Sequence, residues 1–340
     1  MTRKTFACLG IFGFSILAAF SGLGCRSGQG REVVVYTSVD PSYAKVIFAD
    51  FEAESRIKVK GVFDVEATKS AGLANRLIAE SNHPQADVFW SGEPLHILDL
   101  KTKGILEPYR SPSAEDIPSS FKDSQLFWTG LSGRYRVLIF NKDSLKAEDA
   151  PRSMLDLTDE KYGNRIAIAN PLFGTTTFHF ISLYLAMGEP AALDFCEKLK
   201  ANRVRIVDGN SVVRKLVELG EIEMGLTDSD DADLSLSSGM NVGVVLLDQE
   251  SSGALFIPNM VALIKKGPNP EEGRAFIDYL LSREADRKLA DLGWTKVSVR
   301  DVLTSGLASE SKVKYDVVDY ERAAAAKQAA LKQIKERLGI

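Results

Sequence analysis

The segment GLTDSDDAD (225–233) places four carboxylates within six consecutive positions. Neighbouring carboxylates repel one another and raise one another's pKa, so the segment needs a cation, a helix N-terminus or water to offset its charge. Hard cations such as Fe(III), Mn(II) and Ca(II) accept oxygen donors, and an organic ammonium group also pairs with carboxylates. The segment therefore predicts either a cation site built on Asp228, Asp230 and Asp231 or a helix start whose dipole these acids complement.

A second polar segment, PLFGTTTFH (171–179), favours the opposite charge. Backbone N–H groups and hydroxyls at the positive end of a helix hold anions. The pattern predicts an anion site, to which Arg134 of an earlier strand would add positive charge, while ordinary N-capping explains the same threonines. The anion-binding residues expected in this segment are Gly174, Thr175, Thr176 and Thr177.

Common catalytic motifs are absent from the chain after residue 25. It contains no HExxH, CxxC, P-loop, GxSxG or GxGxxG pattern, and the acidic segment fails the EF-hand spacing because Ala232 and Asp233 stand where Asp/Asn and Gly belong. The three histidines, at 83, 96 and 179, are scattered. The sequence thus predicts a binding protein and no enzyme, with an exported hydrolase as a minor alternative because a fold does not fix a function.

Alternating strands and helices must position these segments. Strand patterns lie at 33–36, 57–63, 86–90, 133–141, 165–171, 204–209, 242–247 and 254–266, and helix patterns at 43–55, 69–81, 95–103, 176–187, 191–199, 211–219, 231–237, 270–281, 284–292 and 319–338. This order predicts an α/β fold with a mainly parallel sheet covered by helices on both faces. Ligands of such sheets bind beyond the carboxyl ends of the strands. The loops YTSVD (36–40), WSGE (90–93) and GLTDSDD (225–231) all follow strands.

The N-terminus has the features of an export signal. Arg3 and Lys4 precede an apolar run, Phe6–Phe20, and small residues lead to Cys25. We expect a signal peptide at 1–24, a lipid anchor on Cys25 and a tether at 25–31, with simple signal cleavage near Ser21 as the alternative. The expected location is the periplasm or cell surface, on the membrane through the lipid.

Composition sets further bounds. With 340 residues, 45% of them hydrophobic and 26% charged, the chain is an ordinary globular protein. A net charge of -4 spread along the sequence gives no expectation of nucleic-acid binding. Cys196 lies at helical spacing among apolar residues, which predicts a buried, inert thiol.

Several motifs in order resemble the ferric-iron-type family of extracellular solute-binding proteins, the capture subunits of bacterial ABC transporters. They are VVVYTS, PQADVFWSGE, LSGRYRVLIFNKD, NPLFGTTTFH, VELGEIEMGLTDSDDA and PNMVALIKKGPNPEEGRAFIDYLLS. The resemblance implies a two-lobe periplasmic-binding-protein fold of type II, with crossing strands at a hinge, a ligand cleft between the lobes, and delivery to a permease and an ATPase. We expect lobe 1 at 32–125 and 242–292, lobe 2 at 126–241 and 293–340, and a monomer without a cofactor.

The resemblance also assigns site residues. Ferric-binding members carry two adjacent tyrosines that match Asp230 and Asp231, a histidine that matches Asp40 and a glutamate that matches Glu93. Asp40, Glu93, Asp230 and Asp231 are therefore the expected metal ligands, and Fe(III) or another hard cation is the expected cargo. Asp228 would join them in cation binding, and Trp90 would offer a cation–π face to an organic ammonium group.

The family's anion loop matches PLFGTTTFH, which makes a metal with its accompanying anion one expectation. A phosphate- or phosphonate-bearing organic solute, such as an aminophosphonate or a sugar phosphate, is the alternative.

Overall fold

The structure, a computed structural model, describes residues 30–64, 71–293, 298–300, 313–316 and 318–340. The expected signal peptide and Cys25 lie outside these residues, as do the first residues of the helix expected at 69–81. Arg31–Ile340 forms one compact unit. No helix within the described ranges is long and apolar enough to cross a membrane.

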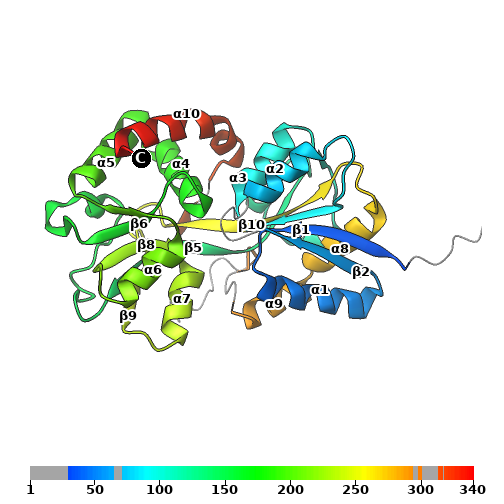
Figure 1. Cartoon of the computed structure of the whole chain (residues 1–340), viewed down its shortest axis with the longest axis horizontal. Coiled ribbons are helices and arrows are strands. Elements are labelled where there is room, and N and C mark those ends of the chain that lie inside the picture. The colour runs from blue at the N-terminus through cyan, green and yellow to red at the C-terminus, as the bar shows by residue number, and fades with distance from the viewer. Residues whose placement is uncertain (1–29, 65–70, 294–297, 301–312, 317) are drawn as a thin grey trace, which may run out of the picture. The chain divides into compact units, whose positions relative to one another are not determined.

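The strands form an 11-stranded sheet with the order β2-β1-β3-β10-β5-β8-β6-β7, to which β4 and β11 add at β10 and β9 adds at β5 (Figure 1). They are β1 (Glu32–Thr37), β2 (Lys58–Phe63), β3 (Val88–Ser91), β4 (Leu106–Glu107), β5 (Thr129–Asn141), β6 (Ile166–Ala169), β7 (Arg205–Val207), β8 (Met224–Asp228), β9 (Val242–Val245), β10 (Ala254–Ile264) and β11 (Tyr315–Asp316). Strand β10 comes late in the chain but lies between β3 and β5.

Parallel pairing holds within two strand groups, β2-β1-β3 and β8-β6-β7. The two long strands β5 and β10 pair antiparallel with each other, β10 is antiparallel to β3, and β5 is antiparallel to β8. The expectation of a mainly parallel sheet is therefore correct only inside each group. Strands β5 and β10 both connect the two groups but run in opposite directions, so they pair antiparallel with each other.

The helices follow the strands as the sequence predicts. They are α1 (Pro41–Ser55), α2 (Ala71–Ala79), α3 (Pro94–Thr102), α4 (Gly174–Met187), α5 (Glu189–Ala201), α6 (Asn210–Glu218), α7 (Ser229–Ser237), α8 (Pro270–Leu280), α9 (Arg283–Asp291) and α10 (Tyr320–Leu338), with 3-10 turns at Pro112–Ala114, Ser119–Phe121, Leu155–Thr158 and Glu160–Tyr162. Two starts follow from local chemistry: Asp40 and Glu93 cap α1 and α3, and each is followed by proline at the first helical position.

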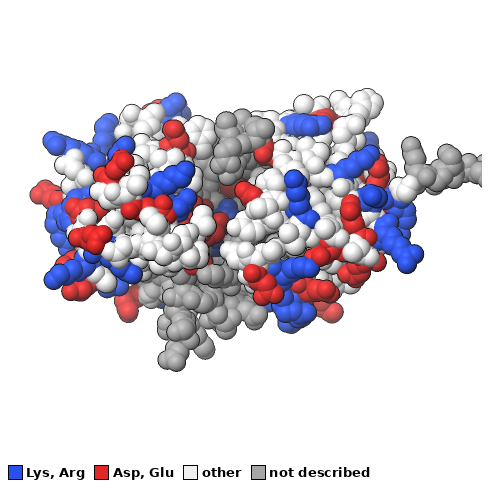
Figure 2. All heavy atoms as spheres, turned by 60° about the horizontal axis from the view of Figure 1, so that its bottom comes forward, with Lys and Arg blue, Asp and Glu red and all other residues white. Residues whose placement is uncertain are grey.

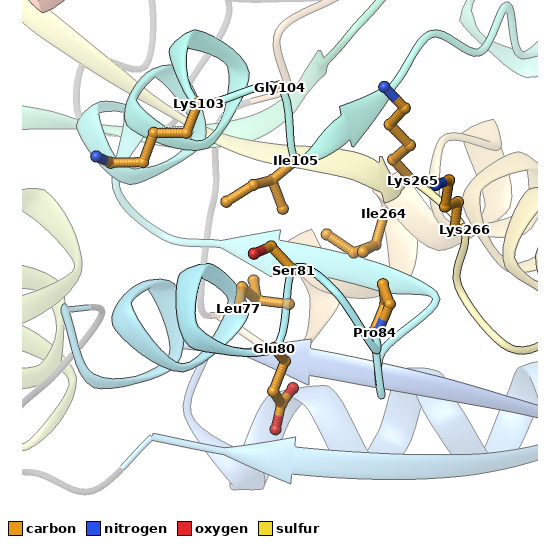
Figure 3. A pocket seen from close by; sticks show the side chains of 10 residues that line it. All are labelled: Leu77, Glu80, Ser81, Pro84, Lys103, Gly104, Ile105, Ile264, Lys265 and Lys266. Carbon is orange, nitrogen blue, oxygen red and sulfur yellow. The ribbon is translucent and has the colours of Figure 1, made fainter.

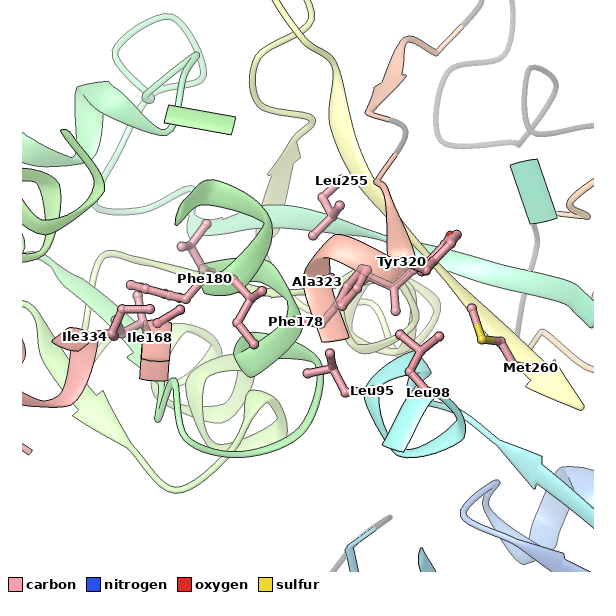
Figure 4. Packing of buried hydrophobic residues seen from close by; sticks show 14 of the residues in the cluster. Leu95, Leu98, Ile168, Phe178, Phe180, Leu255, Met260, Tyr320, Ala323 and Ile334 are labelled. Carbon is pink, nitrogen blue, oxygen red and sulfur yellow. The ribbon is translucent and has the colours of Figure 1, made fainter. Parts of the chain in front are cut away.

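Helix α10 packs against α3, α4 and α5. The Tyr320 ring lies edge-on to Trp128 with centroids 5.1 Å apart and stacks on Phe178 at 5.9 Å. Figure 4 shows Tyr320 between α3, which carries Leu95 and Leu98, and α4, which carries Phe178. One apolar cluster therefore fixes the two helices that begin at the WSGE loop and at the GTTT segment.

One expected lobe boundary differs from the strand pairing. Strand β9 pairs with Leu138–Asn141 of β5, the same part of β5 that pairs with β8. The sequence predicts 242–247 in lobe 1, but this pairing groups β9 with β8. Sequence order alone does not show which edge of a long strand a later strand will join. The remaining lobe boundaries stay predictions.

Candidate functional site

The candidate site is built at the carboxyl ends of β6, β7 and β8, where α4, α6 and α7 begin. Strand β5 lies beside β8, and its residue Arg136 is directly opposite Asp228 in the pairing register. Side chains on a strand alternate between faces, so Arg134 lies on the same face as Arg136. Three helix N-termini and two arginines thus surround Asp228.

Asp228 is held by a dense set of hydrogen bonds. Arg136 Nη1 donates to its Oδ1 at 2.6 Å, and Thr175 Oγ1 and Asn210 Nδ2 donate to its Oδ2 at 2.8 and 3.1 Å. Arg134 Nε lies 3.3 Å from the same Oδ2. Burial by itself would raise the pKa of Asp228, but the charges of Arg136 and Arg134 outweigh it and lower the pKa. Asp228 is therefore an ionised, fully partnered carboxylate.

Arg136 is equally constrained, with a side chain only 1% exposed. Its Nε donates to Nδ1 of His179 at 3.3 Å, and its Nη1 donates to Oδ1 of Asn210 at 3.0 Å. Burial and the neighbouring Arg136 charge lower the pKa of His179 to about 3, which keeps the imidazole neutral. Nη2 of Arg136 is buried and has no hydrogen-bond partner in the described part of the chain. Nη2 is therefore able to donate a hydrogen bond to a bound ligand.

Asp230 and Asp231 occupy the first turn of α7. One carboxylate oxygen from each of Asp228, Asp230 and Asp231 lies within 4.8 Å of the other two. Burial raises the pKa of Asp230 to about 7 against the opposing charge of Arg134, and it raises the pKa of Asp231 to about 6 with help from the Asp228 charge. Oδ1 of Asp230 is buried without a hydrogen bond to any described residue. Asp231 is partly compensated, because Nε of Arg214 lies 3.5 Å from its Oδ1 and Thr227 Oγ1 donates to its Oδ2 at 3.1 Å. Asp230 has no ion pair with a described residue and is the less compensated of the two acids.

The structure does not bring the other two expected metal ligands into this group. Oδ1 of Asp40 accepts from the backbone and hydroxyl of Ser42 at the start of α1. Oε1 of Glu93 accepts from the Leu95 backbone at 2.9 Å, and burial raises the pKa of Glu93 to about 7. Both carboxylates act as helix caps, a role that local sequence permits as readily as metal binding.

Asp40 and Glu93 nevertheless act electrostatically on the site. Burial raises the pKa of Tyr43, and the charges of Asp230 and Asp40 raise it further. Asp40 and Asp230 therefore act on the same phenol. Burial would lower the pKa of Arg134, but the charges of Asp230, Asp228 and Asp231, with a smaller share from Glu93, raise it. Arg134 also donates from Nη2 to the Gly92 carbonyl at 2.8 Å, which ties β5 to the WSGE loop.

Trp90 does not lie at the site surface. Its side chain is fully buried in β3 and packs edge-on to Phe48 at 6.5 Å. Strand β3 is central and is covered on both faces, so the burial of every residue from Val88 to Ser91 follows from its position. The cation–π role expected for Trp90 is not supported.

The GTTT segment lies inside the first turn of α4, two residues earlier than the expected helix start. Gly174 has φ +60°, a left-handed conformation that glycine adopts without strain. No side chain caps the helix at Phe173, so the threonines are not N-caps. Thr175, Thr176 and Thr177 are buried, and Oγ1 of Thr177 has no partner among the described residues.

Sequence reasoning missed Arg136, Asn210, His179 and Tyr43 as site residues. Arg136 had a usable signal, because it shares a strand face with Arg134. Asn210 had another, since it opens α6 directly after β7 at the same edge of the sheet. His179 and Tyr43 offer no such signal in the sequence.

Charged side chains of both signs are mixed over the face shown in Figure 2. The concentrated charge lies in the buried group around Asp228.

The family model for bacterial extracellular solute-binding proteins matches residues 83–324. The chain belongs to this family. Its relatives include Iron uptake protein A1 of Synechocystis, 26% identical over 91% of this chain and 88% of that protein. Another is a putative 2-aminoethylphosphonate-binding periplasmic protein of Salmonella typhimurium, 27% identical over 86% of each.

A solved structure of iron-bound HitA from Pseudomonas aeruginosa has a TM-score of 0.80 to this solute-binding protein. It is 21% identical and covers 90% of this chain and 99% of the other. This likeness confirms the periplasmic-binding-protein fold that the sequence predicts. The resemblance to the ferric-iron-type family is also confirmed.

Proposed function

We propose that this solute-binding protein is the capture subunit of an ABC importer and binds Fe(III) or a similarly hard cation at Asp230 and Asp231. The observation that carries the proposal is the buried, unbonded Oδ1 of Asp230, beside two further carboxylates within 4.8 Å. Clustered carboxylates in a buried position are stable when a cation supplies the missing positive charge. Oxygen donors suit hard cations.

The iron-uptake name of a relative supports this cargo. Asp228 is not one of the proposed ligands, because two arginines already neutralise it. The proposed ligand set is therefore Asp230 and Asp231, with Asp40, Tyr43 and Glu93 near enough to change its electrostatics.

An anion subsite adjoins the acids. No side chain caps the α4 N-terminus, and Nη2 of Arg136 and Oγ1 of Thr177 have no hydrogen-bond partner among the described residues, which favours a bound anion beside the cation. Arg134, the arginine that the sequence predicts here, donates to the Gly92 carbonyl and pairs with Asp228, and its Nε has no hydrogen bond to a described residue. The proposed anion subsite therefore adds Arg136 to Arg134 and to Gly174, Thr175, Thr176 and Thr177.

A phosphonate- or phosphate-bearing organic solute is the second candidate. The same unfilled donors favour it, and a relative carries a 2-aminoethylphosphonate-binding name. In that case Asp230 and Asp231 would accept from the ammonium or hydroxyl end of the solute. The two candidates differ in which subsite supplies the selectivity.

A thermal-shift titration separates them. The mature chain, stripped of metal, is titrated with ferric citrate, citrate alone, Mn(II), Ca(II), 2-aminoethylphosphonate and phosphate esters. A ligand at about 100 times its Kd stabilises the folded state by roughly 2.7 kcal/mol. A rise with ferric citrate beyond the citrate control supports the hard cation, and a rise only with phosphorus compounds supports the second candidate. Turnover of a generic ester or phosphoester would support the hydrolase alternative and contradict a pure binding role.

We also propose that the protein is exported, is anchored through lipid on Cys25, is monomeric and delivers its solute to a permease with an ATPase. The export pattern at 1–24 supports the location. Mass spectrometry of the N-terminal peptide from membranes tests the lipid: a diacylglyceryl mass on Cys25 supports it, and cleavage near Ser21 contradicts it.

A further inference from the structure

A pocket of about 150 Å³ lies at the edge of the sheet where β3 begins and β10 ends. Its floor is apolar and includes Leu77, Ile105 and Ile264. Figure 3 shows these side chains together at the centre, with Lys103 on one side and Lys265 and Lys266 on the other. The volume is too small for a drug-sized ligand and suits a small polar head group.

The rim of this pocket carries uncompensated positive charge. Lys103, Lys265 and Lys266 are exposed, and none has a carboxylate partner among the residues that the structure describes. The acid in the lining, Glu80, is already bonded to the Tyr36 hydroxyl and to Arg76. Lys103 follows α3, where a cation is favoured by the helix dipole, but Lys265 and Lys266 follow a strand and have no such role.

Strand register places this rim beside the point where the folded unit begins. Val35 of β1 pairs with Val88 of β3, which pairs with Leu263 of β10. At the end of β10 the Ile264 N–H donates to the Asp87 carbonyl and the Asp87 N–H donates to the Val34 carbonyl, so this end lies two strands from β1, or about 10 Å at ordinary strand spacing. Lys265 and Lys266 lie in the turn that follows directly. The loops YTSVD and WSGE lie at the opposite ends of β1 and β3.

The chain between Cys25 and Arg31 is short. Fully extended, the residues 26–30 and the bonds that flank them span about 20 Å. A lipid on Cys25 would therefore keep the edge with the lysine rim close to the membrane. Basic residues within a Debye length of an anionic surface are attracted to it.

We propose that the pocket and its lysine rim dock on anionic phospholipid head groups. The inference rests on the proposed lipid attachment at Cys25. The partner is a lipid surface, and the apolar floor accepts the glycerol region of one head group.

The test attaches the chain to vesicles chemically, so that it does not depend on acylation in the cell. A chain that begins at Cys25 is coupled to maleimide lipid in vesicles with or without phosphatidylglycerol, and Cys196→Ala removes the second thiol, which is buried. Amine labelling read by mass spectrometry reports the exposure of each lysine. Each basic residue at an anionic surface favours the docked orientation by about fivefold.

We expect Lys103, Lys265 and Lys266 to label about fivefold more slowly, or slower still, on anionic than on neutral vesicles, with the protection lost in high salt. The exposed lysines Lys142, Lys146 and Lys215 serve as controls and should label equally on both. The variant Lys265→Glu/Lys266→Glu should lose the protection of Lys103, whereas Lys142→Glu/Lys146→Glu should retain it. Equal labelling of the rim lysines on both vesicles, or equal protection of the controls, would overturn the proposal. Absence of native acylation would contradict only the role of Cys25.

Discussion

Arg136 and Asp228 face each other directly across β5 and β8, with Nη1 2.6 Å from Oδ1 and side chains only 1% and 7% exposed. Buried ion pairs of this kind are stable because each charge satisfies the other, and removing one partner leaves an uncompensated charge. The pair therefore anchors the site and leaves Asp230, with Oδ1 unbonded to any described residue, as the acid that most needs a ligand, beside Asp231 and its partner Arg214.

Replacing Arg136 should be strongly destabilising. Arg136→Met leaves Asp228 buried with less compensation, so we expect the free energy of unfolding to fall by about 3–5 kcal/mol. Urea unfolding followed by circular dichroism measures the change. The double variant Arg136→Met/Asp228→Leu should recover a large part of the loss because it removes both charges. A single-variant loss below about 1 kcal/mol would show that the pair is not a structural anchor.

Asp230 should make the stability of the ligand-free protein fall as pH rises. Burial raises its pKa to about 7, so the folded state favours the protonated form, and this stabilisation is lost as pH rises through 7. Asp230→Asn should therefore raise the free energy of unfolding at pH 8, by on the order of 2 kcal/mol, and by less at pH 5. His96 and His179 are present in both the unmodified chain and the Asp230→Asn variant, so their titration cancels in the difference between the two free energies of unfolding. A gain that is larger at pH 5 than at pH 8 would contradict the assignment.

Cation binding should require both acids of the first turn of α7. Asp230→Ala and Asp231→Ala are each expected to abolish the thermal shift caused by ferric citrate over citrate, because the remaining carboxylate leaves a hard cation with too few oxygen donors. The exposed Asp194→Asn variant on α5 is the matched control and should bind normally. If both alanine variants bind metal as the unmodified chain does, the acids only complement the α7 dipole.

The unpartnered Thr177 hydroxyl should report on the anion. Thr177→Val removes Oγ1 with little change in shape, so any bound phosphate or phosphonate loses one hydrogen bond, worth roughly 0.5–1.5 kcal/mol or about two- to tenfold in Kd. Isothermal titration with 2-aminoethylphosphonate, or with metal plus anion, measures the change. Thr102→Val on α3 is the control, and equal affinities for the two variants would place the anion elsewhere.

Much of the fold could be predicted because its signals are local. The strand expected at 254–266 is Ala254–Ile264, and the helix expected at 270–281 is Pro270–Leu280. Apolar periodicity and proline or glycine at element ends determine these spans. The grouping of β9 with β8 depends on long-range pairing, for which the sequence carries no local signal.

The sequence predicted which segments form the site, but it did not predict which side chains bond to Asp228. GTTT and the acids do lie together, since Thr175 donates to Asp228. The sequence could not show that Arg136 and Asn210 would occupy Asp228, because these contacts join residues far apart in the chain. The burial of Trp90 also depends on neighbours from other elements, whereas Glu93 caps its own helix through the Leu95 backbone, a contact that local sequence permits.

The most direct measurement is an anomalous difference map at the iron absorption edge, from crystals of the metal-stripped protein soaked in ferric citrate. We expect a peak in contact with carboxylate oxygens of Asp230 and Asp231, with Asp228 still bonded to Arg136. No peak at that position, combined with density for a phosphorus compound at Thr177 and Arg136 in crystals soaked with 2-aminoethylphosphonate, would contradict the metal proposal in favour of the organic solute.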